Sequence, residues 1–179
     1  KAILGGQWGD EGKGKIVDLL SKDVNIVARY QGGANAGHTV YKDNQKIVLH
    51  QIPTGALRET CKCILGKGMV IDPIGILDEI NILKNIDILV EGRILIDYFC
   101  HIVTPIHKAI DRTNEERTNN TIGTTCKGIG PTYVDKYNRV GIRAIDLLSE
   151  NTLNKKLDFR LERAIENNEI KQEMISDLN

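Results

Sequence analysis

Short apolar runs alternate with helix-spaced apolar positions along most of this chain, and glycine-rich segments separate them. The short runs predict strands over 2–4, 25–30, 39–41, 46–50, 61–65 and 93–96. The third and fourth of these runs face each other as a hairpin. Helical spacing predicts helices over 15–21, 72–85, 104–116 and from 149 through 163. The alternation favours an α/β fold with a mostly parallel central sheet flanked by helices, and a further helical segment toward the C-terminus.

Local signals indicate several boundaries. Asp72-Pro73 and Thr104-Pro105 each place a capping side chain before a proline at the first helical position. The glycines of Gly66-Lys67-Gly68 are expected to end the strand over 61–65. Residues 118–143 are rich in glycine, threonine and arginine, and they predict a long irregular loop with a functional role.

The charge balance excludes two kinds of partner. Lysine plus arginine and aspartate plus glutamate are equal at 24 each, so no basic field would draw the chain to nucleic acid or to an anionic membrane. The 41% of hydrophobic and 27% of charged residues are typical of a soluble globular domain. No apolar run approaches the roughly 20 residues that span a bilayer, and no signal-peptide pattern opens the chain. These features predict a cytoplasmic protein.

The four cysteines are expected to be reduced and structural. Cys61 and Cys63 have C-x-C spacing rather than the C-x-x-C of zinc and redox sites, while Cys100 and Cys126 stand alone. Neither a disulfide framework nor a zinc site is therefore indicated.

The first chemical motif is a glycine-rich segment, 9–15, between a predicted strand and a predicted helix. It has the G-x-x-x-x-G-K spacing of a P-loop, in which glycine amides, the helix N-terminus and lysines such as Lys13 and Lys15 hold phosphate. Ile16 stands where a P-loop has the Ser or Thr that holds magnesium. Asp10 is the obvious replacement, as a metal ligand, a base or both. The alternative is a solvated glycine turn, which the flanking strand and helix disfavour.

The second motif, 30–39, surrounds Asn35, His38 and Thr39 with glycine and alanine, residues that are expected to fill no core. A lone histidine is more often structural than catalytic, but the small residues before His38 would leave it open to a ligand. We therefore expect His38 to belong to a functional site. The alternative is a glycine turn that leads into the hairpin.

The third motif, 122–131, combines glycines with Thr124 and Thr125. Threonine hydroxyls and backbone amides suit a phosphate or a sugar, and guanidinium groups such as those of Arg139 and Arg143 bind phosphate oxygens in pairs. The functional interpretation is a second phosphorylated ligand. The alternative for the two arginines is that they are ordinary surface cations.

Together the three motifs resemble those of the adenylosuccinate synthetase family. WGDEGKGK stands at 8–15, GGANAGHT at 32–39 and IGTTCKGIGP at 122–131, in the family's order. The resemblance implies a GTP- and magnesium-dependent C–N ligase of purine biosynthesis. Such an enzyme joins IMP and L-aspartate into adenylosuccinate and releases GDP and phosphate, in the first committed step from IMP to AMP.

The resemblance also implies roles for individual residues. Asp10 would be the general base that takes the proton from N1 of IMP, His38 the general acid in phosphoryl transfer through 6-phosphoryl-IMP, and Lys13 a third catalytic residue. The implied GTP-binding residues are Gly9, Asp10, Glu11, Gly12, Lys13, Gly14, Lys15, Gly37, His38 and Thr39. The implied IMP-binding residues are Asp10, Glu11, Gly12, Lys13, Asn35, Ala36, Gly37, His38, Thr125 and Arg139. One Mg²⁺ per subunit would be held by Asp10 and the carbonyl of Gly37.

Two further implications concern assembly and extent. Arg139 would reach the IMP bound to a neighbouring subunit, which implies a homodimer. Residues 1–143 would form the GTP- and IMP-binding portion, and 144–179 a helical segment truncated before the rest of the enzyme. Since the chain opens at Lys1 without methionine and stops in a polar helical run, we expect a fragment that is inactive alone.

Two other interpretations stay open. The chain could belong to a different phosphotransferase with an unusual P-loop, which would hydrolyse GTP or ATP without IMP. It could also be a truncated, non-catalytic nucleotide-binding remnant.

Overall fold

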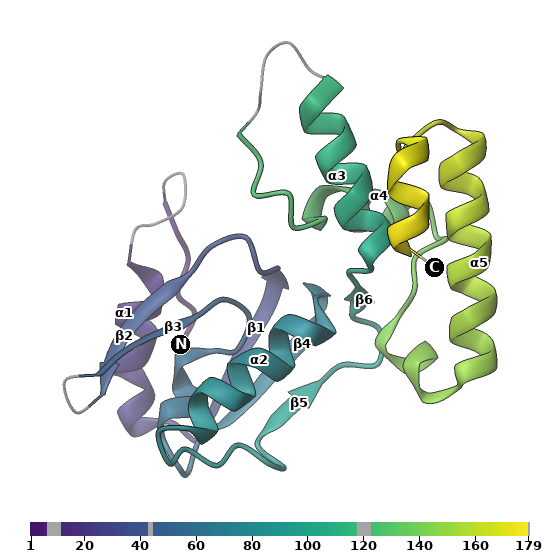
Figure 1. The fold of residues 1–179 in the computed structure, drawn as a ribbon. Coiled ribbons are helices and arrows are strands. Elements are labelled where there is room, and N and C mark those ends of the chain that lie inside the picture. Colours follow the sequence, from purple (N-terminus) through teal and green to yellow (C-terminus); the bar gives the residue numbers. More distant parts are fainter. Residues whose placement is uncertain (7–11, 43–44, 118–122, 179) are drawn as a thin grey trace. The chain divides into compact units, whose positions relative to one another are not determined.

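The computed structural model describes residues 1–6, 12–42, 45–117 and 123–178, and the chain forms two compact units, Lys1–Asp97 and Tyr98–Asn179 (Figure 1). With η for a 3-10 helix, the first unit contains α1 (Lys13–Leu20), η1 (Ser21–Asp23), β1 (Ile26–Gly32), β2 (His38–Lys42), β3 (Gln45–Leu49), η2 (Thr54–Leu57), β4 (Lys62–Ile71), α2 (Pro73–Lys84) and β5 (Ile94–Ile96). The second contains β6 (His101–Ile102), α3 (Pro105–Arg117), α4 (Ile129–Tyr137), η3 (Ala144–Leu148), α5 (Glu150–Glu166) and η4 (Gln172–Leu178). The predicted division into 1–143 and 144–179 concerns function and stays a prediction.

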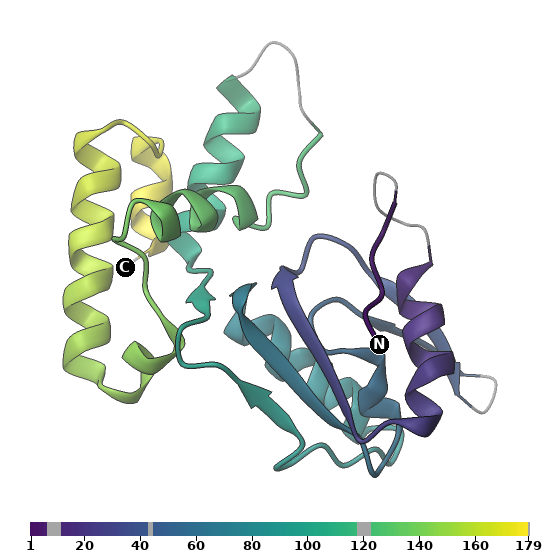
Figure 2. The same ribbon diagram turned by 180° about the vertical axis from the view of Figure 1, so that it is seen from behind.

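A parallel sheet organises the first unit. β4 lies between β1 and β5 and runs parallel to both, with Ile26 opposite Lys62 and Cys63 opposite Ile94. α2 lies in front of these strands in Figure 1 and behind them in the reverse view of Figure 2. β2 and β3 pair antiparallel, and their turn at 43–44 lies outside the described residues. The predicted α/β class and the predicted hairpin are confirmed.

The expectation that Gly66-Lys67-Gly68 ends a strand is wrong, because β4 continues through these residues. Beside them, β1 shifts its pairing register between Arg29 and Gln31. A Cβ added to Gly68 would lie only 2.1 Å from the carbonyl oxygen of Tyr30. The glycines therefore permit a close approach of two strands at a bulge rather than a turn.

The expected strand over 2–4 is also wrong. Residues 1–6 have no strand assignment, and Leu4 is 70% exposed. A run this short becomes a strand only where a neighbouring strand supplies hydrogen bonds, and within the described residues none pairs with it. The helix that was expected from residue 15 is confirmed, although α1 already begins at Lys13.

The predicted helix starts are confirmed, but one capping contact differs. The Asp72 side chain does not cap α2. Instead, the backbone N–H of Asp72 donates to Oε1 of Gln51 at 2.8 Å, and its carbonyl accepts from Nε2 of Gln51 at 3.0 Å. Before α3, Oγ1 of Thr104 lies 2.8 Å from Nδ1 of His107. A buried glutamine from elsewhere in the chain thus holds one helix start that the sequence predicts to be held locally.

Helices build the second unit, around the buried apolar residues Ile106, Ala109, Ile110, Ala164 and Ile170. The expectation of an irregular loop over 118–143 is wrong for α4, which lies within it; residues 118–122 lie outside the described residues. α4 is short and contains glycine and proline, so its apolar spacing gives little helical signal. Burial of its Thr132 and Asp135 ties it to the rest of the unit.

The four cysteines are free thiols, as predicted. Burial raises the pKa of Cys63 to about 12, so this thiol is protonated at neutral pH and unreactive. Of the helices that the structure describes, none combines the length and apolarity needed to cross a membrane.

Candidate functional site

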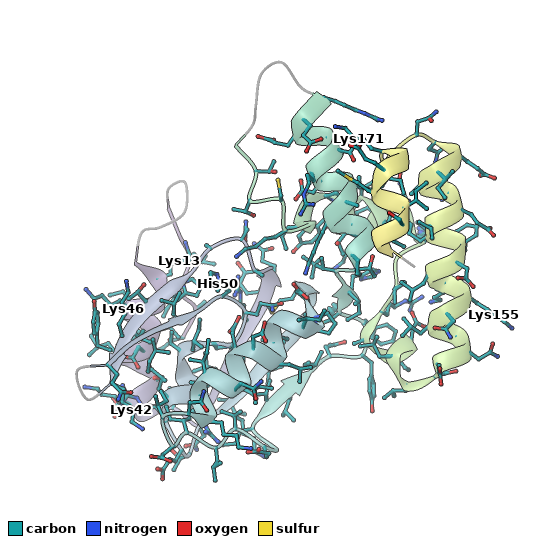
Figure 3. All side chains as sticks on the ribbon, viewed as in Figure 1. Lys13, Lys42, Lys46, His50, Lys155 and Lys171 are labelled. Atoms are coloured by element: carbon teal, nitrogen blue, oxygen red, sulfur yellow. The ribbon has the colours of Figure 1, made fainter. Side chains whose placement is uncertain are left out.

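The described end of the first motif is the start of α1. Gly12 precedes the helix with a left-handed backbone, φ 81°, which glycine adopts without strain. Its carbonyl accepts from the N–H groups of Lys15 and Ile16 at 3.0 and 3.2 Å. Lys13, labelled in Figure 3, is half-buried in the first turn, and Lys15 is exposed. The predicted residues that lie outside the described part of the chain are Gly9, Asp10 and Glu11.

His38 packs directly against the first turn of α1. Gly14 is buried, and a Cβ added to it would lie 2.7 Å from Cβ, 2.8 Å from Cγ and 3.0 Å from Nδ1 of His38. His38 is the first residue of β2 and is partly exposed. The fold thus brings the predicted acid of the second motif beside the predicted phosphate loop of the first.

Two side chains hold α1 in this position. Oγ1 of the buried Thr54 donates to the carbonyl of Gly14 at 3.1 Å. Nη2 of Arg58 forms an ion pair with Oδ1 of Asp18 at 2.8 Å. Both contacts join α1 to the segment of η2, and neither has a signal in the sequence.

Arg29 of β1 links the second motif to the residue that follows β3. It does so by donating hydrogen bonds to a backbone carbonyl in each. Its guanidinium donates to the carbonyl oxygens of Gly33 at 2.8 Å and of His50 at 2.5 Å. Gly33 and Ala34 are buried, so the expectation that the small residues fill no core is wrong for these two. The exposed residues of the motif include Asn35, Gly37 and Thr39.

Gly37 lies at the point where the second motif approaches β3. A Cβ on Gly37 would lie 3.1 Å from Cε1 of His50, which Figure 3 labels, and 3.1 Å from Cγ1 of Val48. A larger residue here would require His50 and Val48 to give way, so glycine permits this close approach of the second motif to β3.

A buried carboxylate supports the segment that follows β3. Glu79 of α2 is 4% exposed and accepts from the backbone N–H groups of Gln51 and Ile52, both at 2.9 Å. Burial raises the pKa of Glu79 because it disfavours the charged form, although the N–H donors oppose this shift. Sequence analysis missed Glu79 and Arg29, since a charged residue within a helix or strand pattern is normally assigned to the solvent face.

The third motif forms a loop of left-handed turns over 123–128. Gly123 and Gly128 have φ values of 71° and 74°, and Cys126 one of 50°. The N–H of Cys126 donates to Oγ1 of Thr124 at 3.3 Å. Thr125 is exposed, so its hydroxyl is accessible to a ligand.

Arg139 and Arg143 differ in their surroundings, although the sequence treats them alike. Arg139 is exposed just after α4 and has a left-handed backbone, φ 62°. A left-handed residue directly after the C-cap is a common way for a helix to end, and Asn168 has this conformation at the same place after α5, so the backbone of Arg139 belongs to the end of α4. The guanidinium carbon of Arg143 lies 5.6 Å from the ring centroid of Phe99, and its backbone pairs with His101. Arg143 therefore has a structural role of its own.

A buried polar network joins α3, α4 and α5. Nε2 of the fully buried His107 lies 3.0 Å from Oδ2 of Asp135, and Nε of Arg160 donates to the same carboxylate. The N–H of Thr104 donates to Nδ1 of His107 at 3.0 Å, which assigns the ring proton to Nε2. Burial alone would raise the pKa of Asp135, but the hydrogen bonds from His107 and Arg160 lower it. Its burial makes this network structural.

The predicted site residues fall in both units. The first unit contains Gly12, Lys13, Gly14, Lys15, Asn35, Ala36, Gly37, His38 and Thr39, among which the first turn of α1 meets His38. The second unit contains Thr125 and Arg139.

A metal cage is not found in the part of the chain that the structure describes, where no three His, Cys, Asp or Glu side chains come together suitably. Mg²⁺ commonly keeps several waters and binds through one or two carboxylates and substrate phosphates. Of the two predicted magnesium ligands, Asp10 lies outside the described residues, and Gly37 is exposed directly before His38.

Three comparisons with known proteins agree with one another. A family model described as adenylosuccinate synthetase matches residues 2–177. The adenylosuccinate synthetase of Salinibacter ruber is 49% identical over 169 residues, covering 89% of this chain and 38% of the relative. That of Chlorobium limicola is 51% identical over 156 residues, covering 87% of this chain and 36% of the relative. The solved structure of fully ligated adenylosuccinate synthetase from Plasmodium falciparum matches with a TM-score of 0.79 and 40% identity, over 89% of this chain and 38% of that chain.

The chain therefore spans between 36% and 38% of the length of these relatives. The family match nevertheless extends over both units and all three motifs. This chain belongs to the adenylosuccinate synthetase family.

Proposed function

We propose that this chain supplies the phosphate-handling part of a GTP- and magnesium-dependent ligase that joins IMP and L-aspartate into adenylosuccinate, releasing GDP and phosphate. The observation that carries the proposal is the contact between the first turn of α1 and His38, where a Cβ on Gly14 would lie 2.7 Å from the histidine. A cationic, glycine-rich helix start beside an imidazole suits transfer of a phosphoryl group to a neighbouring acceptor. Membership of the family supports the choice of substrates.

The first step would make the C6 oxygen of IMP a nucleophile. Asp10 takes the proton from N1, and negative charge develops on O6. N1 of the purine is much more basic than a carboxylate, so the proton moves only if a cation stabilises the anion. Lys13, in the first turn of α1, is the cation that this chain provides.

The second step would transfer the γ-phosphate. O6 attacks the γ-phosphorus, the bond to the oxygen of GDP breaks, and 6-phosphoryl-IMP forms. His38 donates a proton or hydrogen bond on the phosphoryl side, while the amides of the first and second motifs neutralise charge. The amino group of aspartate then attacks C6, and the C6–O bond breaks to release phosphate.

Magnesium would be held by Asp10 and the carbonyl of Gly37, one ion per subunit, and when bound it neutralises charge on the transferred phosphate. The residues of this chain would orient the two nucleotides around it. The remaining GTP contacts come from Gly9 to Lys15 and from Thr39. The remaining IMP contacts come from Asn35, Ala36, Thr125 and Arg139.

The exposure of Arg139 directly after α4 leaves its guanidinium accessible to a ligand, which supports a binding role for its side chain. We propose that it reaches the IMP of a second subunit, which makes a homodimer part of the active site. The cytoplasmic location expected from the sequence stays a prediction.

The test is an assay of GDP release by the full-length gene product that carries this sequence, with and without IMP and aspartate. We expect release only when both are present, with one adenylosuccinate formed per GDP. Turnover of GTP without IMP would instead indicate a different phosphotransferase, and nucleotide binding without any turnover would indicate a non-catalytic protein.

Two variants test the assigned roles. Asp10→Ala and His38→Asn should each lower kcat by roughly 10²–10⁴-fold while IMP still binds, because each removes a proton-transfer group. Rates near those of the unmodified enzyme would reject both assignments.

A further inference from the structure

Two carboxylates of α3 accept hydrogen bonds from loop 123–128, the described part of the connection between α3 and α4. The backbone N–H of Gly123 donates to Oε1 of Glu115, and that of Gly128 donates to Oδ2 of Asp111, both at 2.8 Å. Asp111 and Glu115 are four residues apart, so their side chains lie on the same face of the helix. One helix face therefore anchors the loop at two residues, Gly123 and Gly128.

The glycines at these two positions are required by the anchoring. A Cβ on Gly128 would lie 2.9 Å from the backbone carbon of His107 and 2.9 Å from the backbone nitrogen of Lys108, so the loop end rests directly on α3. Gly123 has open space around it, and its left-handed backbone directs its N–H to Glu115. The contact at Gly128 is buried, whereas the one at Gly123 is exposed.

Between the two anchors the loop is organised for binding. Oγ1 of Thr124 accepts from the N–H of Cys126, so this hydroxyl shapes the loop itself. Thr125 is exposed between them. The two carboxylates thus bind the N–H groups of Gly123 and Gly128, while Thr125 between them stays exposed.

We infer that Asp111 and Glu115 are positioning residues that hold loop 123–128 in the shape in which Thr125 contacts a nucleoside monophosphate. The inference rests on the proposed function, which assigns Thr125 to IMP. Hydrogen bonds from N–H groups to carboxylates are stronger than neutral ones, so the anchors order the loop before the ligand arrives. A loop that is already ordered loses less conformational freedom on binding, which strengthens affinity.

The test is Glu115→Ala in the full-length gene product, because Glu115 lies at the exposed anchor and the protein should still fold. We expect the KM for IMP to rise about tenfold, since one charge-assisted hydrogen bond is lost. The KM for GTP and kcat at saturating IMP should change by less than about twofold. Glu115→Gln, which keeps an oxygen that accepts from Gly123, should restore most of the affinity.

The matched control is Glu116→Ala, at the next position of α3. Glu116 forms an ion pair at 2.5 Å with Lys171, a residue that Figure 3 labels. An unchanged KM for IMP in Glu115→Ala, or equal effects of Glu115→Ala and Glu116→Ala, would overturn the inference. So would a parallel rise in the KM values for IMP and GTP.

Calorimetric titration with IMP alone separates this inference from the proposed function. An unmodified protein that binds IMP but releases no GDP contradicts the proposed function, and the Kd for IMP in Glu115→Ala then decides the inference. An unmodified protein that binds no IMP overturns both.

Discussion

The two units hold their ligand loops in opposite ways. In the first unit, a cation holds backbone acceptors, because Arg29 donates to the carbonyl of Gly33 in the second motif and to that of His50, which follows β3. In the second unit, two anions hold loop 123–128 through its donors, because Glu115 and Asp111 accept from backbone N–H groups. The guanidinium of Arg29 adds positive potential beside the second motif, where a triphosphate is proposed to bind.

Among residues that only position these loops, Gly14→Ala is expected to have the largest effect. The added Cβ would lie 2.7 Å from Cβ of His38, a contact that neither backbone can relieve without a shift. We expect kcat/KM for GTP to fall by about 100-fold, as expected for a displacement of about 1 Å at a reacting centre. Steady-state assays measure this loss, and Lys22→Ala, an exposed position just after α1, is the control. Activity within about twofold of the unmodified enzyme would show that His38 is not held by α1.

The next prediction concerns how strongly the guanidinium of Arg29 holds the second motif. Arg29→Ala removes the donors to two carbonyl groups, so the free energy of unfolding of the first unit should fall by about 2 kcal/mol. Arg29→Lys should recover only part of this loss, because an ammonium group cannot reproduce the fork of a guanidinium. Urea denaturation measures both values. Equal stabilities of Arg29→Lys and the unmodified protein would mean that charge alone holds the loop.

The two units should also respond to pH in opposite directions, and His101 sets the response of the second. Burial, together with the positive charges of Lys136 and Arg143, lowers the pKa of His101 to about 4. A depressed histidine pKa stabilises the folded state above pH 6.5, and this stability is lost as the pH falls from 6.5 toward 4. The free energy of unfolding of the second unit should fall by about 2–3 kcal/mol over this pH range. His101→Gln should flatten the profile of melting temperature against pH over this window, whereas an unchanged slope would exclude His101 as the cause.

Glu79 should give the first unit a smaller dependence of the opposite sign. Because burial raises its pKa, protonation favours the folded state, and the stability that Glu79 contributes falls as the pH rises through the raised pKa. Glu79→Gln should remove this slope while keeping an acceptor for the N–H groups of Gln51 and Ile52. Melting curves between pH 4 and pH 7 would measure the change. A first unit that gains stability over this range would contradict the assignment.

The sequence predicts the helix after the first motif and the hairpin after the second, but it does not predict the buried charged residues that hold these segments. The P-loop spacing, the hairpin after His38 and the threonine loop follow from glycine chemistry and local periodicity, which depend on neighbouring residues. Arg29, Glu79 and Asp111 act on segments 4 to 28 residues away, and nothing in their own surroundings distinguishes them from solvent-facing charges. α4 and the long course of β4 were missed for the same reason, because tertiary contacts stabilise them against a weak local signal.

The central claim is that the C6 oxygen of IMP attacks GTP beside the first and second motifs, which carry Asp10 and His38 respectively. IMP labelled with ¹⁸O at C6 tests it directly, in a turnover of the full-length gene product with GTP and aspartate. Since the C6–O bond breaks when aspartate attacks, mass spectrometry should find the label in the released phosphate, with one labelled phosphate per adenylosuccinate. Unlabelled phosphate would mean that water attacks GTP, and it would contradict the account.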